Sequence, residues 1–186
     1  MKIRELLGDV AKTVESQSVA TLIKNGSEKG DETAVDVLGC LLTAYNGVLN
    51  DVAINYLGLQ ATAVLSGEKV DLNTLSPTFK RVVDVKNSKG ESISYAMRNG
   101  KIITGEKGAT LIYEYIPENA VVDDDFAYYG KAVGYRAFFY GVASEYCLIK
   151  GRVEESANWE SKYRQATEVK IDFKRRRLKA GKRWGL

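Results

Sequence analysis

Helical periodicity dominates the first third of the chain. Apolar residues between Ile3 and Val14 recur every three or four positions among charged ones, which predicts an amphipathic helix over residues 3–16. Residues 22–31 have the composition of a loop, and Asp31 stands where the N-cap of a second helix would lie. The apolar periodicity then continues to Gly58, and Asn46-Gly47 is where we expect any kink in this helix.

From residue 59 to residue 116 the hydrophobic period changes to two, which is typical of β-strands. Short alternating segments are separated by turn sequences, and two of these, Asn87–Gly90 and Asn99-Gly100, have the composition of hairpin turns. We expect about four to six short antiparallel strands in this region.

Two more helices are predicted after Pro117. The acidic run 123–125 should cap a long apolar helix over residues 125–149, whose glycines 130, 134 and 141 would permit close packing at the centre of a bundle. A more polar helix over residues 152–172 should cover the bundle surface. Its expected inward-facing residues are Val153, Ala157, Trp159, Tyr163 and Ala166.

These elements predict a mainly α fold with an inserted antiparallel β subdomain, which is an α+β class. The helical bundle would comprise residues 1–57 and 118–172, and the β-rich insertion residues 58–117. Residues 173–186 would form an extended basic C-terminal arm.

Charge separates that arm from the rest of the chain. Residues 170–186 carry eight basic side chains and one acidic one, a net charge of +7 in a protein whose total is +3, which leaves −4 for the rest. Such an arm cannot bury itself and usually becomes ordered on a partner. Arginines bind phosphates without reading sequence, but the small total charge favours a protein partner over nucleic acid.

Little in the composition suggests catalysis. The chain has no histidine, which removes the commonest general base and zinc ligand. Cys40 and Cys147 lie in apolar helical patterns and are expected to be reduced core thiols. The run 123–125 lacks the ligand spacing of a calcium loop, so helix capping is favoured over metal binding. The aromatic residues between Tyr128 and Tyr140 are expected in the core rather than as a base-stacking platform. We expect no enzyme and no cofactor.

No membrane association is predicted. The most apolar stretch, residues 132–149, contains Arg136 and Glu145, so a buried helix is favoured over a membrane span. Charged residues interrupt the first ten positions, which is unlike a signal peptide, and we expect the chain to stay in the cytoplasm where it is made.

Several segments taken in order resemble a known family. They are Leu75-Ser76-Pro77 followed by an alternating strand, residues 98–104, residues 111–117, the joint at residues 146–157, and the terminal Arg183-Trp184. This arrangement resembles the tail tubular protein A-like head-to-tail adaptors of tailed bacteriophages, in which a similar hairpin set interrupts a helical bundle. The resemblance covers nearly the whole chain.

The resemblance implies a structural virion protein of the phage neck. Copies would form a ring, typically of about twelve, between the portal and a downstream tail or nozzle protein, with DNA only as the contents of the exit channel. Assembly would take place in the host cytoplasm. The residues implied to dock on the portal are Arg175, Arg176, Arg177, Lys179, Lys182, Arg183 and Trp184. The alternative is a small nucleic-acid-binding protein that uses the same basic tail.

Overall fold

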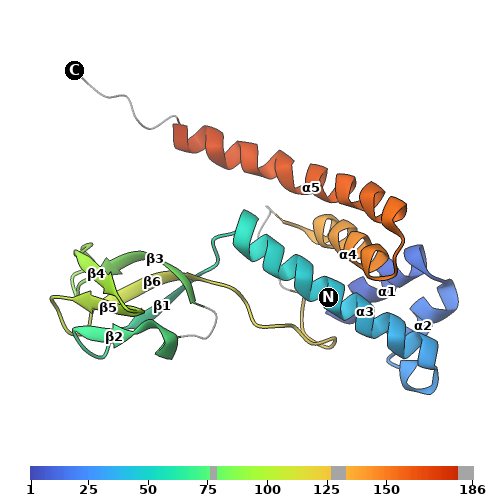
Figure 1. Cartoon of the computed structure of the whole chain (residues 1–186), viewed down its shortest axis with the longest axis horizontal. Coiled ribbons are helices and arrows are strands. Elements are labelled where there is room, and N and C mark those ends of the chain that lie inside the picture. The colour runs from blue at the N-terminus through green and yellow to red at the C-terminus, as the bar shows by residue number, and fades with distance from the viewer. Residues whose placement is uncertain (76–78, 127–132, 180–186) are drawn as a thin grey trace. The chain divides into compact units, whose positions relative to one another are not determined.

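The computed structural model describes residues 1–75, 79–126 and 133–179, and gives only the backbone of the last helix from residue 168 onward. The predicted mixed α+β class is confirmed (Figure 1). The chain divides into a helical unit, Met1–Val52 with Asn119–Leu186, and a β unit, Ala53–Glu118. The insertion predicted from the sequence, residues 58–117, begins five residues later and ends one residue earlier than the β unit.

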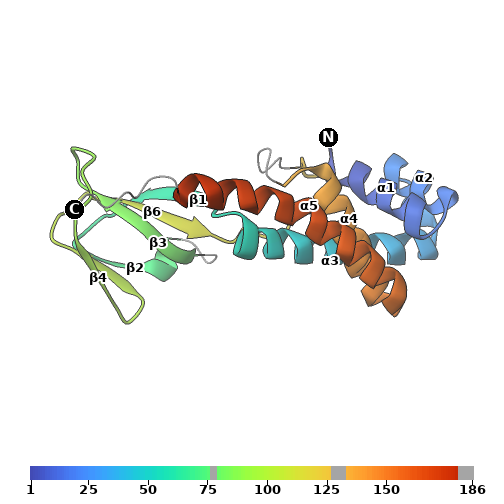
Figure 2. The ribbon, with the colours of Figure 1, turned by 90° about the horizontal axis from the view of Figure 1, so that it is seen from above.

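The helical unit is built around one central helix. Its elements are α1 (Ile3–Val14), α2 (Gln17–Asn25), the short turn η1 (Glu28–Gly30), α3 (Glu32–Asp51), α4 (Tyr135–Ile149) and α5 (Val153–Lys179). α4 packs against α1, α3 and α5, and Figures 1 and 2 show it between α3 and α5. Phe138 of α4 is fully buried, with its ring 5.5 Å from that of Tyr45 and 5.1 Å from that of Phe126. The expected position of this helix inside the bundle is confirmed.

The N-terminal helices agree with the sequence except for α2. α1 is confirmed, and so is the N-cap at Asp31, whose carboxylate accepts the Ala34 N–H at 2.9 Å. The loop predicted over residues 22–31 is wrong in its first part, because α2 runs to Asn25 and ends at Gly26 in the left-handed conformation (φ 66°). α2 buries only Ala20 and Ile23, too few positions to establish a period.

Asn46-Gly47 does not interrupt the helix. α3 is helical throughout and continues as the π-helical turn η2 (Val52–Tyr56). The Asn46 side chain instead exchanges two hydrogen bonds with the backbone of Ala120, accepting at 2.8 Å and donating at 3.2 Å. The helix Glu32–Tyr56 is long and apolar enough by length and composition to cross a membrane, but α3 buries one face in the helical core, and core helices pass the same test.

The predicted helix cap at residues 123–125 is wrong. α4 begins at Tyr135, with Gly134 as an N-cap that offers no side chain, while residues 127–132, including Gly130, lie outside the described part of the chain. Asp123 pairs with Arg4 and Asp125 with Lys2. Two cations at the start of α1 therefore hold these carboxylates, and no described helix begins directly after them.

α5 differs from its prediction in length and in facing. It continues to Lys179 rather than ending near residue 172, since lysine, arginine and leucine are all good helix formers. Among its residues up to Thr167, the buried positions are Ser156, Tyr163 and Thr167, whereas Val153 and Ala157 are exposed, so the predicted inner face is wrong at those two residues. Small hydroxyl residues can face inward here because the Thr167 hydroxyl donates to the Tyr163 carbonyl within the helix.

The β unit contains two three-stranded antiparallel sheets. Its strands are β1 (Gln60–Val64), β2 (Lys69–Asp71), β3 (Phe79–Lys86), β4 (Tyr95–Arg98), β5 (Lys101–Thr104) and β6 (Thr110–Tyr115). The strand orders are β1-β6-β3 and β2-β5-β4. The hairpin at Asn99-Gly100 is confirmed, with positive φ at both residues as a type I′ turn requires. The unit has its own core, made of Leu65, Leu72, Val85, Ile102, Ala109, Leu111 and Tyr113.

Close helix packing at Gly141 gives a testable pair of substitutions. A Cβ at Gly141 would lie 2.9 Å from Cγ2 of Val48 and 3.1 Å from the Tyr163 ring, both buried side chains. We expect Gly141→Ala to lower the free energy of unfolding by about 1–3 kcal/mol. Gly47→Ala on α3, where nothing lies within 4 Å of the added atom, should raise it by about 0.5–1 kcal/mol. Urea denaturation followed by helical circular dichroism measures both, and equal effects of the two substitutions would contradict the expectation.

Candidate docking site

α5 is longer than α4, so its last turns extend past the start of α4. α5 has 27 residues and α4 has 15, and the two run antiparallel from a tight turn at residues 150–152. At 1.5 Å per residue they are about 40 Å and 22 Å long, so α5 passes the start of α4 near residue 168. Figure 1 shows the final turns of α5 running on beyond α4. These turns belong to the basic segment.

The predicted docking residues fall in two parts of this segment. Arg175, Arg176, Arg177 and Lys179 lie in the last turns of α5, whose side chains the structure does not describe. Lys182, Arg183 and Trp184 lie outside the described residues. Residues 173–179, which the sequence assigns to the arm, are therefore helical. Because successive helical residues are about 100° apart, three consecutive arginines spread around the helix rather than along one stripe.

The turn before α5 is rigidly built. The Arg152 N–H donates to the Cys147 carbonyl at 2.8 Å and the Gly151 N–H to the Leu148 carbonyl at 3.0 Å, which together form a Schellman motif. Gly151 has the positive φ of 73° that this motif requires. Lys150 pairs with Asp36 of α3, and the Arg152 guanidinium pairs with Glu15 and donates to the Val14 carbonyl at 2.6 Å. The start of α5 is thus fastened to both α1 and α3.

The first four turns of α5 are held by specific side-chain contacts. The Ser144 hydroxyl donates to the Ser156 carbonyl at 3.0 Å, and the Tyr163 hydroxyl donates to Asp51 of α3 at 2.6 Å. The Trp159 ring stacks on Tyr140 at 5.9 Å, and Lys162 lies 3.9 Å from the centre of the Trp159 ring. These contacts fix the first four turns of α5 on α3 and α4.

A groove opens beside α5 at the N-terminal end of α4. It has a volume of about 490 Å³, and its apolar lining residues, Ala137, Tyr140 and Ala166, are called its floor below. The remaining lining residues are Gly134, Arg136, Lys162 and Gln165. This groove could not be predicted from the sequence, because it depends on where α4 begins and on which residues of α5 meet it.

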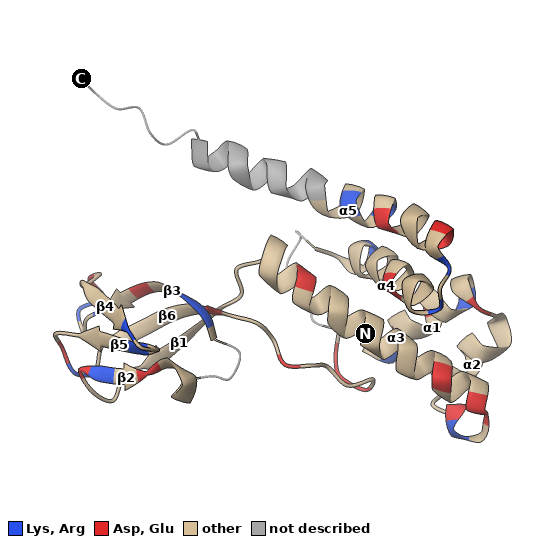
Figure 3. Cartoon of the chain, viewed as in Figure 1, with Lys and Arg blue, Asp and Glu red and all other residues tan. Residues whose placement is uncertain are grey.

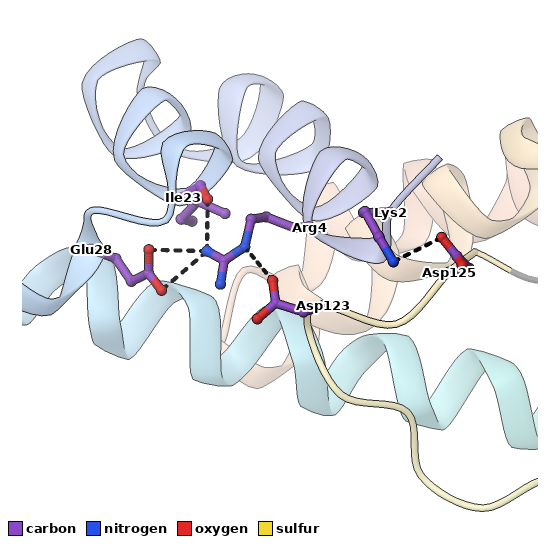
Figure 4. A network of polar contacts seen from close by, with 6 residues as sticks. All are labelled: Lys2, Arg4, Ile23, Glu28, Asp123 and Asp125. Carbon is purple, nitrogen blue, oxygen red and sulfur yellow. Dashed lines mark hydrogen bonds and ion pairs between the residues drawn. The ribbon is translucent and has the colours of Figure 1, made fainter.

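A second polar cluster joins distant parts of the helical unit (Figure 4). Arg4 donates to both carboxylate oxygens of Glu28, at 3.1 and 3.0 Å, and to the Ile23 carbonyl at 2.9 Å. Its Nε donates to Asp123 at 2.9 Å, and hydrogen bonds from Arg4 hold the pKa of Asp123 below its usual value. The Arg4 and Glu28 side chains are only 15% and 8% exposed. The bonds link α1, the end of α2 and the segment before Phe126, so the cluster has a structural role.

The described residues contain no obvious catalytic or metal centre. No group of three or more His, Cys, Asp or Glu side chains among them could hold a metal ion. Cys40 is half-buried and Cys147 fully buried, and both are free thiols. Burial raises the pKa of Cys147, which makes it a poor nucleophile. Burial likewise raises the pKa of Tyr146, whose hydroxyl donates to Glu15 at 2.7 Å.

No protein-family model matches the chain, and no curated protein matches it either. Function is therefore inferred from residues and geometry.

Proposed function

We propose that the protein is a structural, non-enzymatic subunit of a tailed-phage neck. Copies would form a head-to-tail adaptor ring between portal and tail, around the DNA exit channel, with the basic C-terminal helix of each copy docked on the portal. The observation that carries this proposal is the basic helix α5, which is anchored firmly at its start and continues beyond the bundle at its end. The order of elements, a helical bundle interrupted by a β insertion and followed by this helix, is that of the family the sequence resembles.

Physical reasoning favours docking over a free tail. The turns beyond residue 168 extend a helix that is already formed, and packing against a partner would stabilise them further, because tertiary packing supplies most helical stability in proteins. Residues 170–186 carry a net charge of +7, which favours an acidic surface. The apolar residues Phe173, Leu178 and Trp184 in the same segment would supply the buried anchors that protein interfaces use.

The alternative, binding of nucleic acid, uses the same basic segment. Arginines distributed around a helix suit phosphate contacts that read no sequence. This alternative requires tight binding of DNA by the isolated chain, with an affinity that falls steeply as salt rises. The adaptor proposal requires weak DNA binding at most.

Deleting residues 173–186 tests the proposal. The truncated protein should keep its melting temperature, because the helical unit has a buried core in α1, α3 and α4, and should lose docking to the purified portal. Sedimentation of the protein with and without portal measures docking. In the full chain, replacing Arg175, Arg176 and Arg177 by Gln should weaken docking, whereas replacing the exposed Lys89, Arg98 and Lys107 of the β unit by Gln should not.

Two outcomes would count against the adaptor. A truncated protein that unfolds, or that still docks, contradicts the assignment of residues 173–186 as the docking element. A full-length chain that ignores the portal but binds DNA tightly at low salt supports the nucleic-acid alternative.

A further inference from the structure

The end of α4 and the start of α5, on either side of their connecting turn, expose apolar side chains. Leu148 is 52% exposed, Ile149 46% and Val153 64%. Glu154 and Glu155 follow directly, and Figure 3 shows acidic residues at the start of α5. We call these five residues the knob. The turn itself, residues 150–152, is polar, but the ends of the two helices beside it expose three aliphatic side chains, and the turn is fastened to α1 and α3. A preorganised apolar tip loses little entropy when it binds.

The groove at the other end of the same helix pair has complementary chemistry. Its floor of Ala137, Tyr140 and Ala166 is largely apolar, and Arg136 and Lys162 lie on its lining. Arg136 is exposed and forms no ion pair with any described residue. We call this groove the socket. Aliphatic side chains suit its floor, and the carboxylates of Glu154 and Glu155 suit its two cations.

Knob and socket cannot meet within one molecule. Residues 153 and 165 are twelve positions apart on α5, which is about 18 Å along a straight helix. The basic residues of the chain's own C-terminal segment carry the same charge as Arg136 and Lys162, so they are unsuited to the socket. The knob of a second copy of this chain is free to enter the socket and has the matching chemistry.

We infer that the knob of one copy docks in the socket of the next. The contact uses two different surfaces, so an open row of copies keeps one free knob at one end and one free socket at the other until a ring closes, which is the property of a heterologous interface. This inference rests on the proposed function and deepens it, because it names the surfaces by which adaptor copies join side by side.

Variants that damage each half separately test the contact. Arg136→Glu with Lys162→Glu reverses the charge of the socket, and Val153→Asp places a charge among the apolar side chains of the knob. In sedimentation velocity, each variant alone should self-associate at least about tenfold more weakly than the unmodified protein. Arg98→Glu with Lys107→Glu, the same charge change on exposed residues of the β unit, should leave association unchanged. Circular dichroism spectra and melting curves check that all variants are folded.

Mixing the two damaged proteins gives the sharpest result. The socket variant retains an intact knob and the knob variant retains an intact socket, so the mixture should form a one-to-one complex that grows no further. A mixture that grows like the unmodified protein, or variants that each associate normally, would overturn the inference while leaving the adaptor proposal in place. An unmodified chain that stays monomeric at every concentration, with or without portal, would overturn both.

Discussion

Replacing Arg4 by Ala lowers the free energy of unfolding by about 3–5 kcal/mol. The main cost is the buried carboxylate of Glu28 that remains without a cation, rather than the loss of the Arg4 hydrogen bonds themselves. Glu28 is 8% exposed, and both of its oxygens accept from the Arg4 guanidinium. Without Arg4 a charged carboxylate stays buried with no cation beside it, and removing one partner of a buried ion pair is far more costly than removing both. The bond to Asp123 adds little, because that side chain is 73% exposed.

Two comparisons isolate this cause. Lys2→Ala removes an ion pair of the same segment, with Asp125, whose side chains are 53% and 79% exposed, and should change stability by less than about 1 kcal/mol. The double replacement Arg4→Met with Glu28→Met should be less destabilising than Arg4→Ala alone, since no buried charge remains. Urea denaturation followed by helical circular dichroism measures all three proteins. Arg4→Ala behaving like Lys2→Ala would show that Glu28 is not held in the way described.

Features set by neighbouring residues could be predicted from the sequence. Asp31 caps α3 through a bond to a residue three positions away, and Asn99-Gly100 turns the chain because both residues adopt positive φ. The alternation of the β region likewise locates its strands. In each case the residues that decide the structure lie within one element or one turn.

Features set by distant residues could not be predicted. The partner of Asp123 is Arg4, 119 positions away, so local sequence wrongly suggested a helix cap. Which face of α5 is buried depends on Ser144, which donates to the Ser156 carbonyl, and on Asp51, which accepts from the Tyr163 hydroxyl. The socket was missed for the same reason. The basic segment was found because charge is visible in composition, but its partner surface is not.

A second large effect is expected in the β unit, at Glu114 of β6. Its side chain is 6% exposed and accepts two hydrogen bonds from Arg81, at 2.7 and 2.6 Å. Lys80 lies 3.6 Å from the same carboxylate and also donates to the Ile54 carbonyl at 2.8 Å. Replacing Lys80 and Arg81 together by Met keeps their aliphatic stems but leaves Glu114 without a cation. We expect the β unit to lose about 3 kcal/mol of stability at neutral pH.

The pH dependence that Glu114 contributes should change in both sign and pH range in that double variant. The hydrogen bond from Arg81 is the main cause that holds the pKa of Glu114 below its usual 4.5, so its stabilising contribution is present above pH 4.5 and is lost as pH falls through the lowered pKa. In the double variant, burial without a cation raises the pKa of Glu114 above 4.5. Stability should therefore increase as the pH falls from 7 towards 4.5, because protonation removes the buried charge.

Methyl NMR signals of Val85 and Leu111, both fully buried in the β unit, can follow its urea unfolding at each pH. Adding Glu114→Gln to the double variant should abolish the increase towards acid pH, because no titrating group then remains at that position. Arg98→Met with Lys107→Met removes two cations from exposed positions of the same unit and should leave both stability and its pH dependence nearly unchanged. The stability of the Lys80 and Arg81 double variant could instead stay constant between pH 7 and pH 4.5. That result would mean that Glu114 becomes exposed to solvent when its partners are removed. The ion pair would then be a surface contact that does not stabilise β6.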